Sequence, residues 1–293
     1  MSPRSGGEAA KFGERYEGRW TTRHLLYVLL GDVDSVTVED VGEISLGAEF
    51  TVRRGDKIEI HQVKRQIGDA NEWELHVLKA NGVLAAAQHH VSRGRQLWFV
   101  STIPAAVLNS LAHAARRSPG LQSFVEHMLT SQRLRTGFDF LSGKAYGSAE
   151  TAWRTLQGLE VLWPDERDLT RMNAVLAGLL LEGAAPELAA VGLGNLVKDH
   201  LRTPLDAHKL TELLEPFGLR PKQLLGNPTI RQKVSTILTL WKESVERELL
   251  QPAIPIWPQV RPCNTWGLYW ARWIRYRLPR SMNGMAPELS AWT

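Results

Sequence analysis

Three side chains between residues 49 and 64 have the chemistry needed to hold a divalent metal ion beside a positive charge. Glu49 and Gln62 carry oxygens, which are the ligands that Mg²⁺ prefers in proteins, and Lys64 carries an ammonium group. A metal ion held by such oxygens acts as a Lewis acid and lowers the pKa of a bound water, while a cation offsets charge that develops in a transition state. We therefore expect a divalent-metal site here if the fold brings these side chains together.

A β-hairpin centred on Gly55-Asp56 would bring them together. Two runs rich in β-branched and aromatic residues flank this dipeptide, and glycine in first place suits a two-residue type II′ turn. The turn fixes the register, so that counting outward along the ladder sets Glu49 opposite Gln62. Opposed side chains share a face, and Lys64 falls on the same face because strand side chains alternate.

Two further acids are candidates for the same site. Glu17 lies in a segment, residues 8–30, whose apolar side chains recur at three- and four-residue spacing and predict a helix. From this helix Glu17 could reach the site, or it is a surface acid. Asp40 follows a predicted strand at residues 36–39 and is the alternative first metal acid, although its separation from Gln62 is long for a tight hairpin. Which acid is the principal ligand is left open.

The rest of the chain divides by pattern. A buried-strand signal at residues 96–102 completes an α/β alternation, and from residue 104 to about 250 the pattern is helical throughout, including one helix over 153–162. Helices of this length separated by turn signals are typical of a bundle. We expect an α/β core at 1–103, a helical domain at 104–252 and a tail at 253–293.

Composition indicates a soluble globular protein. The chain has 293 residues, 43% of them hydrophobic and 23% charged, without the roughly 18 consecutive apolar residues of a membrane span. The amino terminus leads into charged sequence, so we expect a cytoplasmic protein without a membrane span. Its single cysteine, Cys263, excludes an intramolecular disulfide and a cysteine-cluster zinc site.

The tail differs from the rest in composition. From Ala253 onward, five arginines and one glutamate account for the net charge of +4, so the first 252 residues are neutral and any DNA contact must come from local patches. Five of the eleven tryptophans interleave with these arginines. The tail is either a basic aromatic segment that stacks on nucleic acid or lies at a membrane surface, or a translation past a frame disruption. The abrupt change in composition favours the second.

The hairpin residues resemble the PD-(D/E)xK nuclease pattern, in which an acid on one strand precedes Glu-x-Lys or Gln-x-Lys on the next. Here Glu49 stands where Asp is usual and Gln62 where Glu is commoner. Over roughly residues 6–250 the chain resembles the amino-terminal nuclease region of bacterial defence ATPases of the STAND or NACHT type. The stretches that carry this resemblance are Phe12 to Glu17, Val38 to Asp40, His61 to Gln66, Gly82 to Leu84 and Phe99 to Thr102.

The resemblance implies a restriction-endonuclease-like mixed sheet with flanking helices, followed by an all-α helical bundle. It also implies that Glu49 and Gln62 hold Mg²⁺ (or Mn²⁺), and that Lys64 orients the attacking water or neutralises the phosphate. The expected activity is sequence-nonspecific cleavage of double-stranded DNA in anti-phage defence. The ATPase and sensor parts are not recognisable, so a homo-oligomer or a separate regulatory chain is the expected partner. The alternative is a catalytically inactive assembly or sensing remnant.

Overall fold

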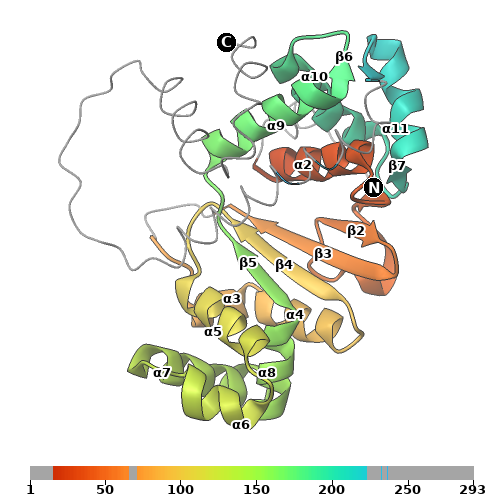
Figure 1. Ribbon diagram of the computed structural model, residues 1–293. Helices are drawn as coiled ribbons and strands as arrows, with labels where there is room; N and C mark the ends of the chain where they lie inside the picture. The colour runs from red at the N-terminus through yellow and green to blue at the C-terminus, as the bar shows by residue number, and fades with distance from the viewer. Residues whose placement is uncertain (1–15, 66–70, 223–231, 233–235, 237–293) are drawn as a thin grey trace, which may run out of the picture. The chain divides into compact units, whose positions relative to one another are not determined.

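The computed structural model describes residues 16–65, 71–222, 232 and 236, and its centre is a six-stranded mixed sheet (Figure 1). The strand order is β5-β4-β3-β2-β1-β7. Strands β3, β4 and β5 are parallel, and the remaining neighbours are antiparallel. The strands are β1 (Ser35–Val38), β2 (Phe50–Arg54), β3 (Lys57–Lys64), β4 (Gln96–Ser101), β5 (Leu159–Leu162) and β7 (Leu205–Asp206). A separate two-stranded ribbon joins β6 (Leu181–Glu182) to β8 (Arg220–Pro221).

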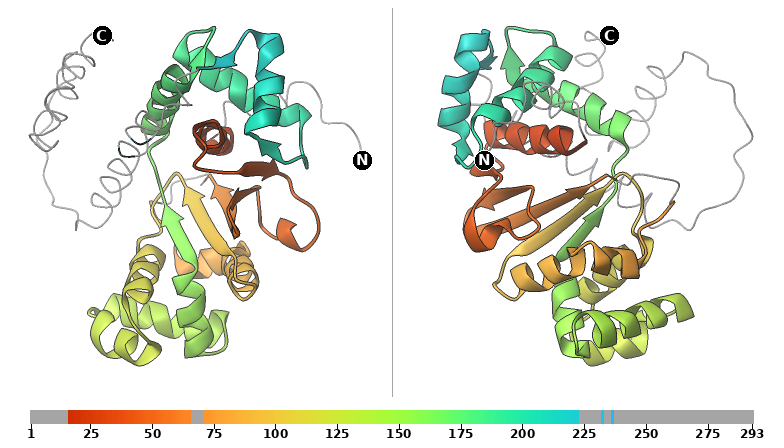
Figure 2. Two further views of the ribbon diagram at one scale, coloured as in Figure 1. Left: turned by 45° about the vertical axis from the view of Figure 1, so that its right-hand side comes forward. Right: turned by 180° about the vertical axis from the view of Figure 1, so that it is seen from behind.

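Helices cover both faces of the sheet (Figure 2). On one face lie α2 (Tyr16–Leu30), α9 (Glu166–Leu180), α10 (Pro186–Leu196) and α11 (Ala207–Leu214). On the other lie α3 (Leu75–Ala80), α4 (Val83–Val91), α5 (Ala106–Arg117), α6 (Leu121–Ser123), α7 (Gln132–Phe140) and α8 (Ala149–Gln157). Short 3₁₀ segments (Gly42–Ser45, Val197–Asp199, Glu215–Phe217) and π segments (Phe124–Met128, Leu141–Ala145) connect them. The expected mixed sheet with flanking helices is thus confirmed.

Successive side chains of β3 point to opposite faces of the sheet, where they enter two different hydrophobic cores. Val63 packs with α2 and α9 residues in the first core, whereas Ile60 packs with α4 and α5 residues in the second. Both side chains are fully buried. A one-residue slip of β3 would move each of its side chains to the opposite face and into the other core. Since both faces are covered by helices, the register of this strand is strongly specified.

The predicted hairpin is confirmed, and its register is confirmed as far as the pair Phe50↔His61. Strand β2 pairs with β3 from Arg54↔Lys57 outward to Phe50↔His61. Gly55 has a φ of +58°, whereas Asp56 is not left-handed, as a type II′ turn requires. The two-residue turn therefore fixes which side chains face each other at the far end of the hairpin.

The segment after residue 104 is mostly helical, but it is not exclusively so. The helix predicted over 153–162 ends at Gln157, and Leu159–Leu162 forms β5 beside β4. Further on, β7 pairs with β1 at the opposite edge. The prediction of one helix was wrong because a four-residue apolar run fits a buried strand as well as the end of a helix.

Other expectations fall partly outside the described residues. Helix α2 is described from Tyr16, and it ends before Gly31, whose φ of +80° makes it a left-handed cap. The helix predicted over 228–250 and the tail at 253–293 lie outside the description. Within the residues that are described, no helix combines the length and apolarity needed to cross a bilayer.

Candidate active site at the carboxyl end of strand β3

The structure brings Glu49 and Lys64 into contact. Glu49 immediately precedes β2, and its N–H donates to the His61 carbonyl oxygen at 2.9 Å, next to the last pair of the hairpin, Phe50↔His61. The Lys64 Nζ atom donates to Glu49 Oε1 at 2.8 Å. About one third of each side chain is exposed, 37% for Glu49 and 33% for Lys64. This acid and amine therefore form a pair that solvent and a substrate can reach.

Gln62, two residues before Lys64 on the same face of β3, has an unused oxygen. Its side chain is 2% exposed, and among the described residues its Oε1 atom has no hydrogen-bond partner. The amide fits against Gly47, where an added Cβ would lie 2.9 Å from Gln62 Nε2. An unsatisfied buried polar group of this kind costs about 1–3 kcal/mol. The chain thus holds a buried amide oxygen in place without using it internally.

Asp40 reaches the same side of the sheet through a backbone turn. Glu39 has a left-handed φ of +51°, and its N–H donates to the Glu49 carbonyl oxygen at 3.0 Å. The Asp40 carboxylate then accepts from Thr51 Oγ1 at 3.2 Å and from the Val41 N–H at 2.8 Å. Since Thr51 is two residues from Glu49, the two side chains share a face. Asp40 is therefore a neighbour of the site rather than a direct partner of Lys64.

Glu17 is placed differently from the other candidates. It is half-buried in the first turn of α2, and α2 covers the face of the sheet opposite to Gln62. To meet Gln62 or Lys64, its carboxylate would have to pass around the carboxyl edge of the strands. The role expected for Glu17 stays a prediction.

The oxygens at the site fit a hard divalent cation, although they are few. Glu49 offers a carboxylate and Gln62 offers an amide oxygen that lacks a partner, and both are suitable for Mg²⁺ or Mn²⁺. Asp40 adds a carboxylate nearby. Across the described part of the chain, however, no three His, Cys, Asp or Glu residues are grouped as a metal site. We expect a site of this composition to bind a cation weakly, because only one direct ligand is charged.

A buried aromatic cluster supports β3 from behind. His61 is fully buried, stacks on Phe50 at 4.5 Å between ring centroids, and accepts a hydrogen bond at Nδ1 from Trp20 Nε1 at 3.1 Å. His24 lies 4.4 Å from it. Burial lowers the pKa of the His61 imidazole, and the Glu59 carboxylate only partly offsets this. His61 therefore has a structural position in the core and points away from Gln62.

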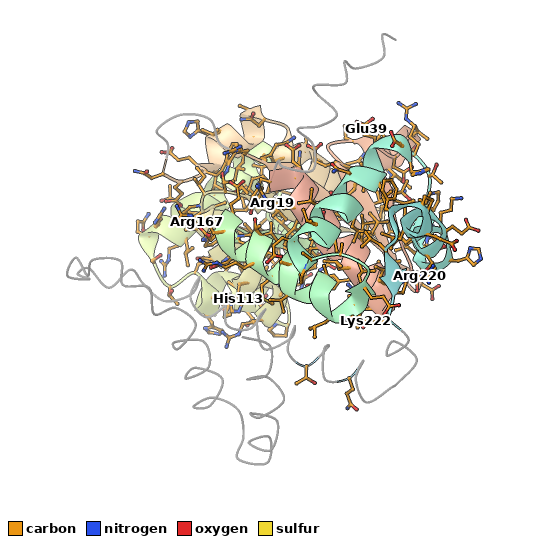
Figure 3. All side chains as sticks on the ribbon, turned by 90° about the horizontal axis from the view of Figure 1, so that it is seen from above. Arg19, Glu39, His113, Arg167, Arg220 and Lys222 are labelled. Carbon is orange, nitrogen blue, oxygen red and sulfur yellow. The ribbon has the colours of Figure 1, made fainter. Side chains whose placement is uncertain are left out.

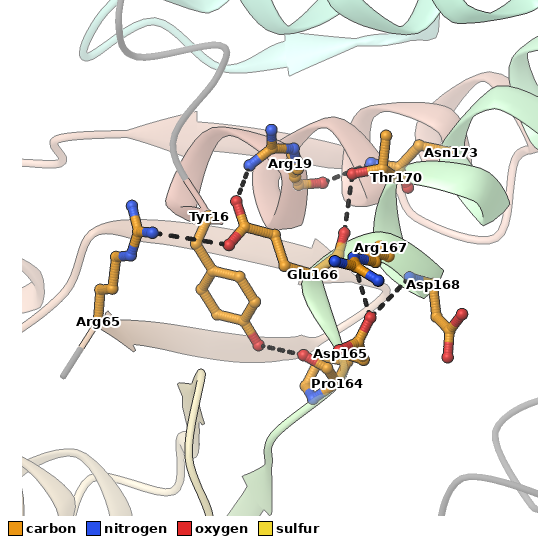
Figure 4. A network of polar contacts seen from close by, with 10 residues as sticks. All are labelled: Tyr16, Arg19, Arg65, Pro164, Asp165, Glu166, Arg167, Asp168, Thr170 and Asn173. Atoms are coloured by element: carbon orange, nitrogen blue, oxygen red, sulfur yellow. Dashed lines mark hydrogen bonds and ion pairs between the residues drawn. The ribbon is translucent and has the colours of Figure 1, made fainter. Parts of the chain in front are cut away.

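Sequence reasoning missed an ionic network at the same edge of the sheet (Figure 4). The Tyr16 hydroxyl lies 2.8 Å from the Ser101 carbonyl oxygen and 3.0 Å from that of Pro164, which joins α2 to the ends of β4 and β5. Glu166, at the start of α9, forms ion pairs with Arg19 and with Arg65. No sequence signal could have shown this, because Glu166 lies about 100 residues or more from both arginines.

Comparison with known proteins adds a distant structural similarity. No family model matches the chain, and no curated protein matches it. A Moraxella osloensis Cap4 SAVED/CARF-domain containing receptor is similar in structure, with 12% sequence identity and a TM-score of 0.44. The similarity covers 70% of this chain and 48% of the receptor, so this chain spans about half of that protein's length. At this level the similarity assigns no activity.

Proposed function

We propose that this chain is a metal-dependent endonuclease that hydrolyses phosphodiesters of double-stranded DNA. The observation that carries the proposal is the Lys64–Glu49 pair, 2.8 Å apart, together with a buried Gln62 oxygen on the same strand face that lacks a partner among the described residues. The order of elements around it, helix α2, hairpin-connected strands, helices and the parallel strand β4, suits a restriction-endonuclease-like core. The defence context rests on the sequence resemblance and is part of the same proposal.

Each residue has a distinct role in this proposal. Glu49 and Gln62 would hold Mg²⁺ or Mn²⁺, which when bound supplies Lewis-acid polarisation of the phosphate and a more acidic water. Lys64 carries a compact positive charge at the surface, where its ammonium can contact a phosphate oxygen or orient a water. Its pairing with Glu49 keeps that charge in one place before a substrate arrives. Asp40 would contribute a second negative charge near the cation.

Plasmid cleavage by the full chain tests the proposal. Supercoiled plasmid is incubated with Mg²⁺ or Mn²⁺ and with wild type, Lys64→Ala, Glu49→Ala or the control Lys57→Ala. Lys57 is an exposed lysine of the same strand at the hairpin turn, far from the site in register. Cleavage that is lost in chelator and in the first two variants but kept in the control supports the assignment. Absence of cleavage by wild type with either metal, even after forced dimerisation, refutes it.

A second candidate function is a catalytically inactive scaffold for assembly or sensing. The observation that favours it is the lack, among the described residues, of three grouped metal ligands. The variant Gln62→Glu separates the two functions, because a second direct carboxylate strengthens Mn²⁺ binding in a working metal site. If wild type neither binds Mn²⁺ nor cuts DNA while Gln62→Glu does both, the natural chain is a scaffold with a disabled site.

A further inference from the structure

The carboxylate of Glu166 lies between two guanidinium groups that come from different elements. Its Oε1 atom accepts from Arg19 Nη1 on α2, and its Oε2 atom is 3.8 Å from Arg65 Nη2, directly after β3. Figure 4 shows all three side chains converging, and Figure 3 shows Arg19 from the side of the helices. One acid therefore faces two arginines, so the group retains one excess positive charge.

The two arginines are engaged unequally. Arg19 is 25% exposed and closely paired, whereas Arg65 is 58% exposed and its contact of 3.8 Å is too long for a hydrogen bond. An exposed ion pair at this distance contributes little to stability, typically about 0–1 kcal/mol. The Arg65 donors therefore face solvent and remain available to another anion.

The backbone that carries Glu166 is held in place independently of the arginines. Asp165 caps α9 by accepting from the N–H groups of Arg167 and Asp168, at 2.8 and 3.2 Å. Tyr16 contacts the Pro164 carbonyl oxygen just before this cap. The backbone position of Glu166 is consequently fixed, and its carboxylate is held by the arginines alone, with one oxygen presented to each guanidinium. That arrangement is the one in which arginines also bind two oxygens of a phosphate.

This group lies at the same strand end as the candidate active site. Arg65 follows Lys64, and because strand side chains alternate, Lys64 meets Glu49 on one face while Arg65 meets the α2 side. The carboxyl end of β3 thus carries cations on both faces. A DNA strand crossing this edge can place one phosphate at Lys64 and a neighbouring phosphate at Arg65.

We propose that Arg19 and Arg65 form a binding site for a DNA backbone phosphate next to the cleaved bond, and that Glu166 occupies this site in the free protein. When DNA binds, its phosphate displaces the Glu166 carboxylate from the two arginines. Glu166 therefore lowers the affinity for DNA, because only a duplex positioned with a phosphate at this site can replace the carboxylate. The inference rests on the proposed function, because it takes DNA as the substrate and the Lys64 region as the place of cleavage.

The test measures DNA binding in chelator, where no cleavage occurs, by fluorescence anisotropy of a short labelled duplex with the full chain. Arg65→Gln should weaken binding about two- to fivefold and reduce the slope of log affinity against log salt by about 0.9. Glu166→Gln should tighten binding by a similar factor, and the double variant should lose that gain. Arg171→Gln is the matched control, since Arg171 is an exposed α9 arginine paired with Asp168 at 3.9 Å.

The outcomes separate this inference from the proposed function. If Glu166→Gln folds normally but binds DNA no more tightly than wild type, or if Arg65→Gln leaves the affinity and salt slope unchanged, the phosphate site is refuted. Failure of the wild-type chain to bind the duplex also refutes it. If the binding changes occur as expected but the plasmid stays uncut with metal, the phosphate site stands and the nuclease activity is refuted.

Discussion

Replacing Gly47 by alanine should lower the free energy of unfolding by about 2–4 kcal/mol, because the new side chain would both strain the backbone and clash with its neighbours. Gly47 has a φ of +69°, and a left-handed backbone costs a residue with a Cβ about 1 kcal/mol. The new Cβ would also lie 2.9 Å from Gln62 Nε2 and 3.0 Å from Ala86 Cβ. Relieving such contacts in a packed interior typically costs about 1–3 kcal/mol.

The variant Gly42→Ala provides the control. Gly42 has a similar φ of +78°, but an added Cβ there meets nothing within 4 Å, so only the backbone cost of about 1 kcal/mol applies. Urea unfolding of both variants measures the difference. Equal destabilisation would refute the reasoning, since it would mean that Gln62 and Ala86 move aside without cost. Because Gln62 must shift in Gly47→Ala alone, we also expect only that variant to bind Mn²⁺ more weakly.

Three further predictions concern other parts of the fold. Burial lowers the pKa of both His24 and His61, so below about pH 6.5 the unfolded state binds more protons than the folded state. The free energy of unfolding should therefore fall as the pH decreases, by up to about 2.7 kcal/mol per pH unit for the two histidines together. Urea midpoints that stay constant from pH 7.5 to 5.5 would contradict this. Asn173→Ala removes the acceptor of buried Arg23 Nε, at 2.9 Å, and should cost about 3–5 kcal/mol, measured by urea unfolding against Asn173→Asp. Lys64→Ala should change stability by less than about 1 kcal/mol, since its ion pair is exposed, so a large loss in thermal melts would assign it a structural role.

The hairpin was predictable because its determinants are local. A two-residue turn at Gly55-Asp56 leaves one register for Phe50 to Arg54, and the ion pair of Glu49 with Lys64 lies just beyond the last pair of that register. The burial of Ile60 and Val63 on opposite faces then selects the same register independently. The turn and the packing of the two cores favour the same register, which is why the strand pairing could be predicted by counting outward from the turn.

The features that sequence reasoning missed depend on long-range packing. Strand β5 has only four residues, and its apolar side chains fit either a strand or a helix end until β4 is known to lie beside it. The pairing of Glu166 with Arg65 is fixed by how α9 packs on α2, which no local spacing encodes. Asp40 approaches Thr51 only because Glu39 adopts a left-handed conformation, which is rare for glutamate.

The two edge strands of the sheet have a consequence for biosynthesis. Strand β7 pairs Asp206 with Ser35 of β1, so this edge of the sheet cannot form until a segment about 170 residues further along the chain has been translated. Until β7 is made, β1 exposes unpaired backbone groups, and β4 does so until β5 is made. Such groups are sites for aberrant association between nascent chains. Such non-local pairing slows folding, because the chain loses the entropy of loop closure before the strand contacts that stabilise it can form. The sheet is therefore completed only after most of the described chain has left the ribosome.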